Sequence, residues 1–307
     1  MATARVSVGL PVYNGEGRIE RALDSVLNQD FRDFELVISD NASTDRTRSI
    51  CETYVERDRR VRYFRNDTNI GVNPNHDRVF ELARGKYFAW FADDVEYLSG
   101  MLRQCVQVIE EAPASVVLVY PRCEMVRDGQ TVAVDERRSI ESRDPRPYRR
   151  LESVVRHVLM VNQLYGLMKR DALGKTQLNG IYPSSDHVLL AELAMLGEIW
   201  EIPATLMRRR IDSDRGTLAV YEDQRAWTAW LGTNARSVKR TWLPYRERLA
   251  VEYLHAAWRL PLRPTDKLMC LLTILPVYYG RMSRSARFVL RLMRPWRHEA
   301  EPGRHGS

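Results

Sequence analysis

Two adjacent carboxylates, Asp93 and Asp94, follow the apolar residues 87–91. Neighbouring like charges repel, so such a pair at the end of a buried strand needs a divalent cation or a set of hydrogen-bond donors to offset the charge. Mg²⁺ and Mn²⁺ favour carboxylate oxygens together with substrate phosphates. The pair therefore indicates a metal and phosphate site, or else a solvated turn that leads into a helix, which is the commoner state of an exposed aspartate.

Polar side chains also follow two other apolar segments. Asp40 comes after residues 34–38, where its carboxylate could accept hydrogen bonds from a nucleobase or a ribose. Tyr13 comes after residues 6–10 and offers an aromatic face to a base, although a tyrosine that packs on the following helix has the same pattern. The Asn-rich segment 66–75 supplies further polar groups, either for a ligand or for a turn. Three segment ends of this kind together favour a binding site.

Apolar, β-rich segments alternate with segments of helical spacing through the first half of the chain. The expected strands are residues 6–10, 34–38, 61–64, 87–91 and 116–120. A helix capped by Ser43 or Thr44 is expected to run to about Glu56, and another to end at Leu82. This order predicts βαβ units and a mainly parallel sheet flanked by helices. Because ligands bind at the carboxyl ends of strands in such sheets, residues after the first, second and fourth strands should meet at one rim.

The second half of the chain has weaker signals. Residues 127–150 are strongly charged and predict a hairpin followed by an exposed loop. Residues 186–196 have the pattern of an amphipathic helix that Gly197 ends. Residues 217–298 are expected to be largely helical.

The net charge of +7 is concentrated near the C-terminus, where eight lysines and arginines accompany three acids from Thr265 onward. The rest of the chain is close to neutral, which argues against a nucleic-acid-binding protein. Five arginines recur at helical spacing: Arg281, Arg284, Arg287, Arg291 and Arg294. They predict a basic amphipathic helix that either rests on an anionic membrane surface or packs on the body with its arginines solvated.

The four cysteines lie far apart and have neither zinc nor redox spacing. The apolar residues 6–12 are too short for a signal peptide and include Pro11. The longest nearly apolar run, residues 268–279, is well short of the roughly 20 residues of a membrane-spanning helix. We therefore expect a cytoplasmic protein that the basic tail could hold on the inner face of the membrane.

Residues 6–45 resemble the N-terminal signature of the family 2 glycosyltransferases. Four motifs carry the resemblance in the family's order: Pro11-Val12-Tyr13-Asn14, the segment from Asp40 to Asp45, Asn69-Ile70-Gly71, and Asp93-Asp94. The match is good over about residues 5–125 and continues more weakly through residues 184–210. It implies the GT-A fold: a nucleotide-sugar-binding α/β half (1–125), an acceptor-side half of the same domain (126–215), and a helical, basic extension (216–307).

The resemblance also implies roles for the matching residues. The nucleotide-sugar donor would contact Pro11, Tyr13, Asn14, Asp40, Asn69, Gly71 and Asp93, with Tyr13 and Asp40 on the base and Asp93 near the ribose and sugar. Asp94 would ligate the Mg²⁺ or Mn²⁺ ion that bridges the diphosphate.

Asp186 would be the general base. It would deprotonate an acceptor hydroxyl for in-line attack on the anomeric carbon, with inversion. Ser184, Ser185 and Asp186 also suit the N-cap of a helix, and the two roles are compatible.

Two positions depart from the family pattern. The commonest form of the acidic motif is Asp-x-Asp-Asp, and Phe91 occupies its first position here. In a similar subgroup a histidine often follows an Arg-rich strand, and the corresponding residue is about Asp212. Asp212 could be a further metal ligand or could pair with an arginine of residues 208–210. That arginine cluster could itself bind a diphosphate or form a solvated basic turn.

These features predict an inverting, metal-dependent glycosyltransferase. It would transfer a sugar from a nucleotide-diphosphate sugar to a hydroxyl of a glycan or lipid-linked acceptor in surface polysaccharide or glycolipid synthesis. Phe91 favours one alternative, a non-catalytic protein that binds nucleotide-sugars or a membrane surface. A sugar nucleotidylyltransferase is a further alternative, but those enzymes usually have a Gly-rich loop with an arginine where this chain has Pro11-Val12-Tyr13-Asn14.

Overall fold

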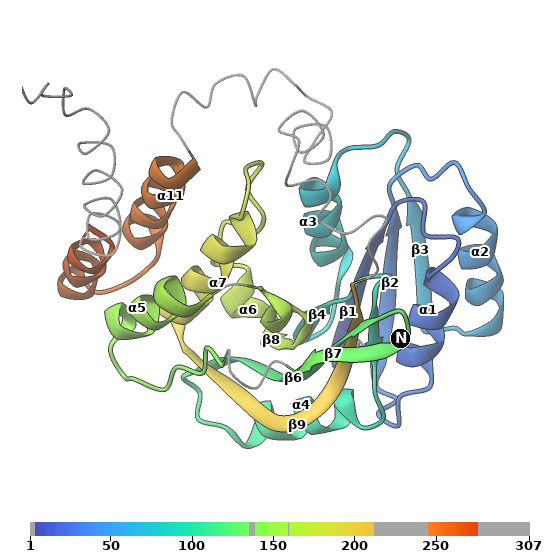
Figure 1. Cartoon of the computed structure of the whole chain (residues 1–307), viewed down its shortest axis with the longest axis horizontal. Helices are drawn as coiled ribbons and strands as arrows, with labels where there is room; N and C mark the ends of the chain where they lie inside the picture. Colours follow the sequence, from blue (N-terminus) through green and yellow to red (C-terminus); the bar gives the residue numbers. More distant parts are fainter. Residues whose placement is uncertain (1–3, 135–138, 159, 212–244, 276–307) are drawn as a thin grey trace, which may run out of the picture.

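The computed structural model describes residues 4–134, 139–158, 160–211 and 245–275. Within these residues one nine-stranded sheet has the order β3-β2-β1-β4-β8-β6-β9-β5, with β7 paired to β6, and helices lie on both of its faces (Figure 1). The strands are β1 (Val6–Val12), β2 (Phe34–Asp40), β3 (Val61–Arg65), β4 (Tyr87–Trp90), β5 (Val95–Tyr97), β6 (Val116–Arg127), β7 (Gln130–Val134), β8 (Leu167–Lys169) and β9 (Glu198–Arg210). The helices are α1 (Ile19–Leu27), α2 (Thr47–Arg57), α3 (Val72–Leu82), α4 (Met101–Glu111), α5 (Pro147–His157), the 3₁₀ turn η2 (Asn162–Tyr165), α6 (Arg170–Leu173), α7 (Ser185–Leu196) and α11 (Tyr245–Arg259).

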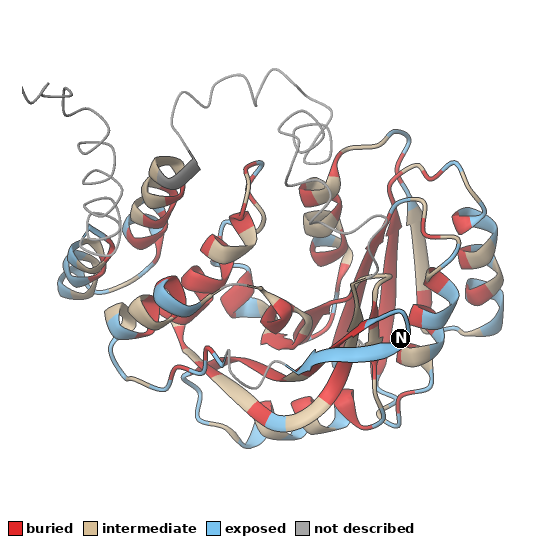
Figure 2. Ribbon diagram, viewed as in Figure 1, coloured by how far each residue is buried: buried red, intermediate tan, exposed pale blue. Residues whose placement is uncertain are grey.

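The four strands from β1 to β4 form a parallel half of the sheet. β1 pairs with β2 and β4, and β2 pairs with β3. β1 and β2 are buried along their whole length, which explains their continuous apolar sequence (Figure 2). The four predicted strands are confirmed, with their ends moved by one or two residues. β1 continues through Pro11 although proline has no N–H to donate. Pairing with β4 stops at Gly9, so no strand on that side needs a hydrogen bond from Pro11.

The other half of the sheet is mixed. β8 is antiparallel to β4 and β6, β9 is parallel to β6, and β5 is antiparallel to β9. The expectation of a mainly parallel sheet therefore holds for the first half only. β6 extends seven residues past the expected end at 120 and turns into β7 through Asp128 and Gly129, with φ values of 51° and 79°. This two-residue turn confirms the predicted hairpin, since both central residues of such a turn need positive φ.

Each face of the sheet has its own hydrophobic core. Side chains of α1, α2 and α4 pack on one face, and those of α3, α5, α7 and α11 pack on the other. α2 begins at Thr47 rather than after a cap at Ser43 or Thr44, because the Ser43 hydroxyl is bonded to the loop after β1 instead. The predicted cap is therefore wrong.

α7 is buried almost all round, so the prediction of an amphipathic helix is wrong. Every residue from Val188 to Met195 is at most 2% exposed. The reason is α11, which covers the side of α7 that would otherwise face solvent. Glu192, fully buried in α7, accepts hydrogen bonds from Arg259 of α11 and from the Gln177 backbone N–H.

The C-terminal extension is helical where it is described. α11 is followed by a second helix over residues 264–275. The predicted basic helix over residues 281–296 lies outside the described residues, as does Asp212. No helix among the described residues is long and apolar enough to cross a membrane.

Candidate functional site

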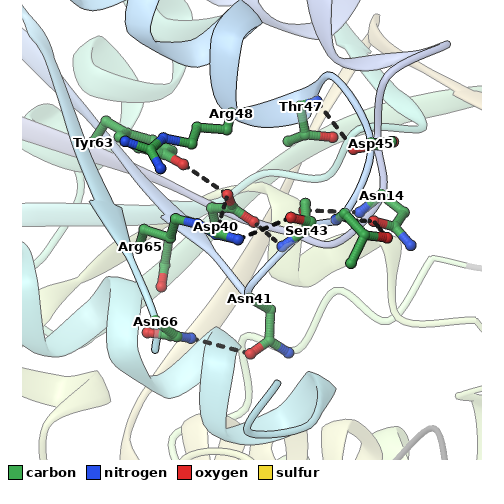
Figure 3. Close-up of polar contacts among 12 residues, drawn as sticks. Asn14, Asp40, Asn41, Ser43, Asp45, Thr47, Arg48, Tyr63, Arg65 and Asn66 are labelled. Atoms are coloured by element: carbon green, nitrogen blue, oxygen red, sulfur yellow. Dashed lines mark hydrogen bonds and ion pairs between the residues drawn. The ribbon is translucent and has the colours of Figure 1, made fainter. Parts of the chain in front are cut away.

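The loops that follow β1 and β2 are bonded to each other at the carboxyl ends of these strands (Figure 3). The Asn14 backbone N–H donates to Ser43 Oγ at 3.0 Å, and Asn14 Oδ1 accepts from the Thr44 backbone N–H at 2.9 Å. The Asn41 N–H donates to the Val12 carbonyl at 2.8 Å. Asn14 has a φ of 51°, a left-handed conformation that asparagine tolerates. Two of the three predicted strand ends therefore do meet at one rim.

Asp40 is fully buried at this rim, and both of its oxygens are bonded within the protein. Oδ1 accepts from the Ser43 backbone N–H at 2.8 Å, and Oδ2 accepts from the Tyr63 hydroxyl at 2.6 Å. Burial and the Asp40 carboxylate both raise the pKa of Tyr63, so this hydroxyl stays a donor. Each carboxylate oxygen can accept a second hydrogen bond. A base contact at Asp40 stays a prediction that requires a ligand to reach this interior position.

Asn69 and Gly71 shape the loop that leads into α3. Asn69 Oδ1 accepts from Asn41 Nδ2 and from the Gly71 N–H, both at 2.9 Å. Gly71 has a φ of 94°, where a side chain would be strained. Their donor contacts also stay predictions, because in the structure both residues hold the loop.

Tyr13 and Pro11 differ in accessibility. Tyr13 is 47% exposed, so its ring is available to stack on a base. Pro11 is buried within β1.

Asp93 is held by Arg18, the residue that directly precedes α1. Arg18 donates from Nε at 3.1 Å and from Nη2 at 2.7 Å, both to Asp93 Oδ2. Burial raises the pKa of Asp93, and the Arg18 guanidinium opposes that rise. Gly15 packs against the same oxygen, because a Cβ there would lie 3.0 Å from Asp93 Oδ2. These contacts bring the end of β4 to the loop after β1 and complete the predicted rim.

The three arginines of residues 208–210 lie on alternating faces of β9. Arg208 and Arg210 pair with Glu96, and Arg208 also pairs with Glu124. Arg209 points the other way and donates from Nε to Asp94 Oδ2 at 3.1 Å. Successive side chains of a strand lie on opposite faces, so only the middle arginine reaches the acidic pair.

Arg209 is fixed on several sides. Its Nη1 donates to Asn162 Oδ1 at 3.0 Å, and its guanidinium lies 5.6 Å from the centre of the Tyr165 ring. Burial lowers the pKa of Arg209, but Tyr165 and Asp94 more than restore it, so the guanidinium stays charged. Asp94 therefore has a permanent cation on one oxygen.

The other oxygen of Asp94 is available to a ligand. Asp94 Oδ1 is buried and has no hydrogen-bond partner among the described residues. A buried carboxylate oxygen without a donor is costly unless a ligand or ion supplies one. The described residues contain no cluster of three or more His, Cys, Asp or Glu side chains that would hold a metal by themselves. One carboxylate oxygen fits a Mg²⁺ or Mn²⁺ ion that is held mainly by substrate phosphates.

Asp186 lies in the first turn of α7. Its Oδ1 accepts from the His187 N–H at 3.0 Å, and the preceding Ser184 has a left-handed φ of 57°. His76 and Tyr165 are each sensitive to the charges of both Asp94 and Asp186. Burial lowers the pKa of His76 while the two carboxylates oppose it, and burial raises the pKa of Tyr165 to about 12 with both carboxylates adding to the rise. The charges of both predicted catalytic carboxylates therefore reach His76 and Tyr165.

α3 holds the loop that precedes Asp186. Asn73 Nδ2 donates to the Gly180 carbonyl and to Ser185 Oγ. Asp77 Oδ1 accepts from the backbone N–H and the side-chain amide of Asn179, at 3.1 and 2.9 Å. These four bonds fix the start of α7 relative to the sheet.

Asp77→Asn should make the protein more stable at pH 8. Burial raises the pKa of Asp77 to about 6, above its ordinary value of 3.8. The folded state therefore binds this proton more tightly than the unfolded state, and stability falls as the pH rises from about 4 to about 6. Asparagine keeps an oxygen for both Asn179 bonds and removes this loss, which we expect to add about 1–3 kcal/mol to the free energy of unfolding at pH 8.

Urea unfolding of both proteins at pH 4 and pH 8 checks this expectation. The gain should vanish at pH 4, and an equal gain at both pH values would contradict it. Asp67→Asn, in the loop before α3, is the control and should show no such difference.

Three residues of the site are absent from the sequence prediction: Arg18, His76 and Tyr165, which have no sequence signal beyond their residue type. Arg209 is predicted only as a member of the cluster 208–210, and strand alternation could have singled it out. Phe91, in the first position of the acidic motif, is fully buried against Tyr97, with ring centres 4.6 Å apart.

The sheet order defines an α/β protein whose polar side chains gather at the strand ends, and comparison with known proteins shows its family. Residues 7–174, more than half of the chain, match the model of glycosyl transferase family 2. The chain belongs to this family, as its sequence motifs predict.

Two curated relatives illustrate the range of similarity. A GalNAc(5)-diNAcBac-PP-undecaprenol beta-1,3-glucosyltransferase of Campylobacter jejuni is 33% identical over 126 residues, which are 41% of this chain and 40% of that protein. The chain thus spans about two fifths of this relative, and a similar share of the next. A putative teichuronic acid biosynthesis glycosyltransferase of Bacillus subtilis, TuaG, is 23% identical over 82% of this chain and 92% of its own length.

Solved structures confirm the GT-A fold. Staphylococcus aureus TarS in complex with UDP-GlcNAc has a TM-score of 0.63 at 18% identity, over 94% of this chain and 76% of that one. The mannosyltransferase PcManGT of Pyrobaculum calidifontis, in complex with GDP-Man and Mn²⁺, has a TM-score of 0.52 at 19% identity, over 96% of this chain and 82% of that one.

Proposed function

We propose that this protein is an inverting glycosyltransferase that uses a nucleotide-diphosphate sugar. The observation that carries the proposal is Asp94, whose buried Oδ1 lacks a donor among the described residues. Asp186 would complete the site, since the charges of Asp94 and Asp186 both reach His76 and Tyr165. A ligand-binding carboxylate in the turn between β4 and β5 and a second carboxylate on a separate helix would supply donor binding and base catalysis.

Donor binding uses the rim of the parallel half-sheet. Tyr13 is exposed for stacking on the base, and Asp40 and Asp93 supply acceptors that Tyr63 and Arg18 hold in place. The diphosphate would lie near Asp94, with Oδ1 of this residue holding a Mg²⁺ or Mn²⁺ ion. Such an ion neutralises charge on a departing diphosphate. The complexes of TarS with UDP-GlcNAc and of PcManGT with GDP-Man and Mn²⁺ support a donor and an ion of these kinds.

Asp186 would act as the general base. Its carboxylate is anchored by the His187 N–H through one oxygen, which leaves the other to accept the proton of an acceptor hydroxyl. The oxygen so activated attacks the anomeric carbon on the face opposite the leaving diphosphate, so the configuration inverts. The four bonds from α3 keep this carboxylate in register with the donor.

The acceptor is a hydroxyl of a glycan or lipid-linked glycan. The names of two relatives support this class, since one is a glucosyltransferase of an undecaprenol-linked glycan and the other a putative teichuronic acid biosynthesis glycosyltransferase. An acceptor held on a lipid would bring the enzyme to the surface of an anionic membrane.

Isothermal titration calorimetry tests the proposal with UDP-, GDP- and dTDP-sugars, with and without Mn²⁺. At least one of these donors should bind, and more tightly with Mn²⁺. If none binds, the proposal fails. If one binds but no sugar is transferred to any member of a glycolipid panel, the protein is the non-catalytic binder that Phe91 favoured.

Arg209→Gln should weaken donor binding about 10–100-fold, because the variant loses charge-assisted hydrogen bonds worth about 1.5–3 kcal/mol. Without the guanidinium, Asp94 loses the contact that fixes its orientation toward the diphosphate. The same titration measures this effect.

Arg208→Gln is the matched control for Arg209→Gln, since the Arg208 guanidinium pairs with Glu96 and Glu124 on the opposite face of β9. The control should bind the donor as the wild type does. Equal donor affinities for both variants would show that Arg209 has no part in the site.

A further inference from the structure

The helix over residues 264–275 exposes an apolar face. Leu268, Leu272 and Leu275 recur at helical spacing and are 57%, 50% and 40% exposed, and Met269 is 38% exposed. Trp258, near the end of α11, is 70% exposed. We call these five side chains the outer C-terminal face. They include half of the ten large apolar side chains that are exposed in the described part of the chain, within only 18 residues.

The opposite side of the same helix anchors it to the protein. Cys270 and Ile274 are at most 1% exposed and belong to the core around α7. The helix is therefore apolar on both sides, but only one side is covered by the body of the protein. A helix that is apolar all round is usually buried on all sides, and a grouped apolar surface marks an interaction site.

Cations border the outer C-terminal face. Lys267 Nζ donates to the Trp258 carbonyl at 2.7 Å and lies 5.7 Å from the centre of the Trp258 ring. Arg263 is exposed between the two helices. Beyond residue 275 the sequence adds seven arginines and two acids. Leucine and tryptophan beside basic residues are the composition of surfaces that lie in the interface of an anionic membrane.

We propose that the outer C-terminal face inserts into the interface of an anionic lipid bilayer. The apolar side chains enter the boundary between headgroups and acyl chains, while Lys267 and Arg263 meet anionic headgroups. The purpose of this contact, bringing the active site to a lipid-linked acceptor, rests on the proposed function. The contact itself rests only on the exposed side chains and the neighbouring charge.

Vesicle flotation with the full chain tests this proposal. The vesicles are an equimolar mixture of phosphatidylglycerol and phosphatidylcholine, with pure phosphatidylcholine as comparison. The wild type should bind the mixed vesicles and bind pure phosphatidylcholine much less. The affinity of Leu268→Gln/Leu272→Gln for the mixed vesicles should be lower by a factor of about ten or more, because two inserting side chains are lost.

Val132→Gln/Val134→Gln is the matched control, since it removes two exposed apolar side chains of β7, far along the chain from the outer C-terminal face. It should bind the vesicles as the wild type does. Thermal unfolding should show that both double variants are folded.

Three results would overturn the proposal. The first is equal vesicle binding by both double variants. The second is wild-type binding that does not distinguish the two lipid compositions. The third is a wild-type dimer in sedimentation velocity that Leu268→Gln/Leu272→Gln dissociates, because a second copy would then cover the face. Donor titration on the wild type separates the two proposals. A wild type that binds a donor but not the mixed vesicles rejects only the membrane contact, and one that binds the vesicles but no donor rejects only the proposed function.

Discussion

Asp186→Asn should reduce kcat by about 10²–10⁴-fold, the usual contribution of a positioned general base. The amide cannot take the proton of the acceptor hydroxyl, yet it preserves the shape of the side chain and can still accept from the His187 N–H. The dissociation constant of the donor should therefore stay close to the wild-type value. Product formation at saturating donor measures kcat, and calorimetry measures the donor affinity separately.

Asp171→Asn is the control for Asp186→Asn, because Asp171 is also an aspartate in the first turn of a helix but is exposed on α6. It should have wild-type kcat. A fully active Asp186→Asn protein would remove this residue as the base and leave its role as a helix-end residue.

Asp94→Asn should reduce kcat/KM by about 10²–10³-fold, because it removes charge stabilisation from the departing diphosphate. Among the carboxylates of the described residues, only Asp94 combines a buried oxygen that lacks a partner with a fixed cation on its other oxygen. The variant should also lose the part of the donor affinity that depends on Mn²⁺. Calorimetry with and without Mn²⁺ shows this loss without any need for turnover.

Asp94→Asn leaves the Arg209 charge buried without its partner, so it could fail to fold for a reason unrelated to metal. The double variant Asp94→Asn/Arg209→Gln removes both charges and should fold, which melting curves will show. It should still lose the part of the donor affinity that depends on Mn²⁺. Glu96→Gln, two residues away on the face that Arg208 and Arg210 occupy, is the control and should retain it. A Mn²⁺ effect that persists in the double variant would place the ion elsewhere.

The parallel half of the fold could be predicted from sequence because each of its elements has a strong local signal. β1 and β2 are buried on both faces and so have continuous apolar sequences. Parallel pairing then brings their carboxyl ends together without further information, as the bonds between Asn14 and the segment Ser43–Thr44 confirm. The positions of Tyr13, Asp40 and Asp93 near one rim follow from the same rule.

The remainder depends on contacts between segments that are distant in sequence. β5 and β8 have three residues each and are strands only because β9, β4 and β6 lie beside them. The sequence predicts a polar, exposed face for α7, but that face is covered by α11, a helix that comes much later in the chain. His76 and Tyr165 come within reach of the charges of Asp94 and Asp186 only in the folded chain, which no spacing along the sequence reveals.

A crystal structure of the protein with its tightest-binding nucleotide-sugar and Mn²⁺ tests the central claim most directly. We predict that the base stacks near Tyr13, that the diphosphate lies at the ends of β1 and β4, and that the ion is bound by Asp94 Oδ1. The anomeric carbon should face Asp186. A nucleotide bound away from these strand ends, or an anomeric carbon turned away from Asp186, would contradict the account.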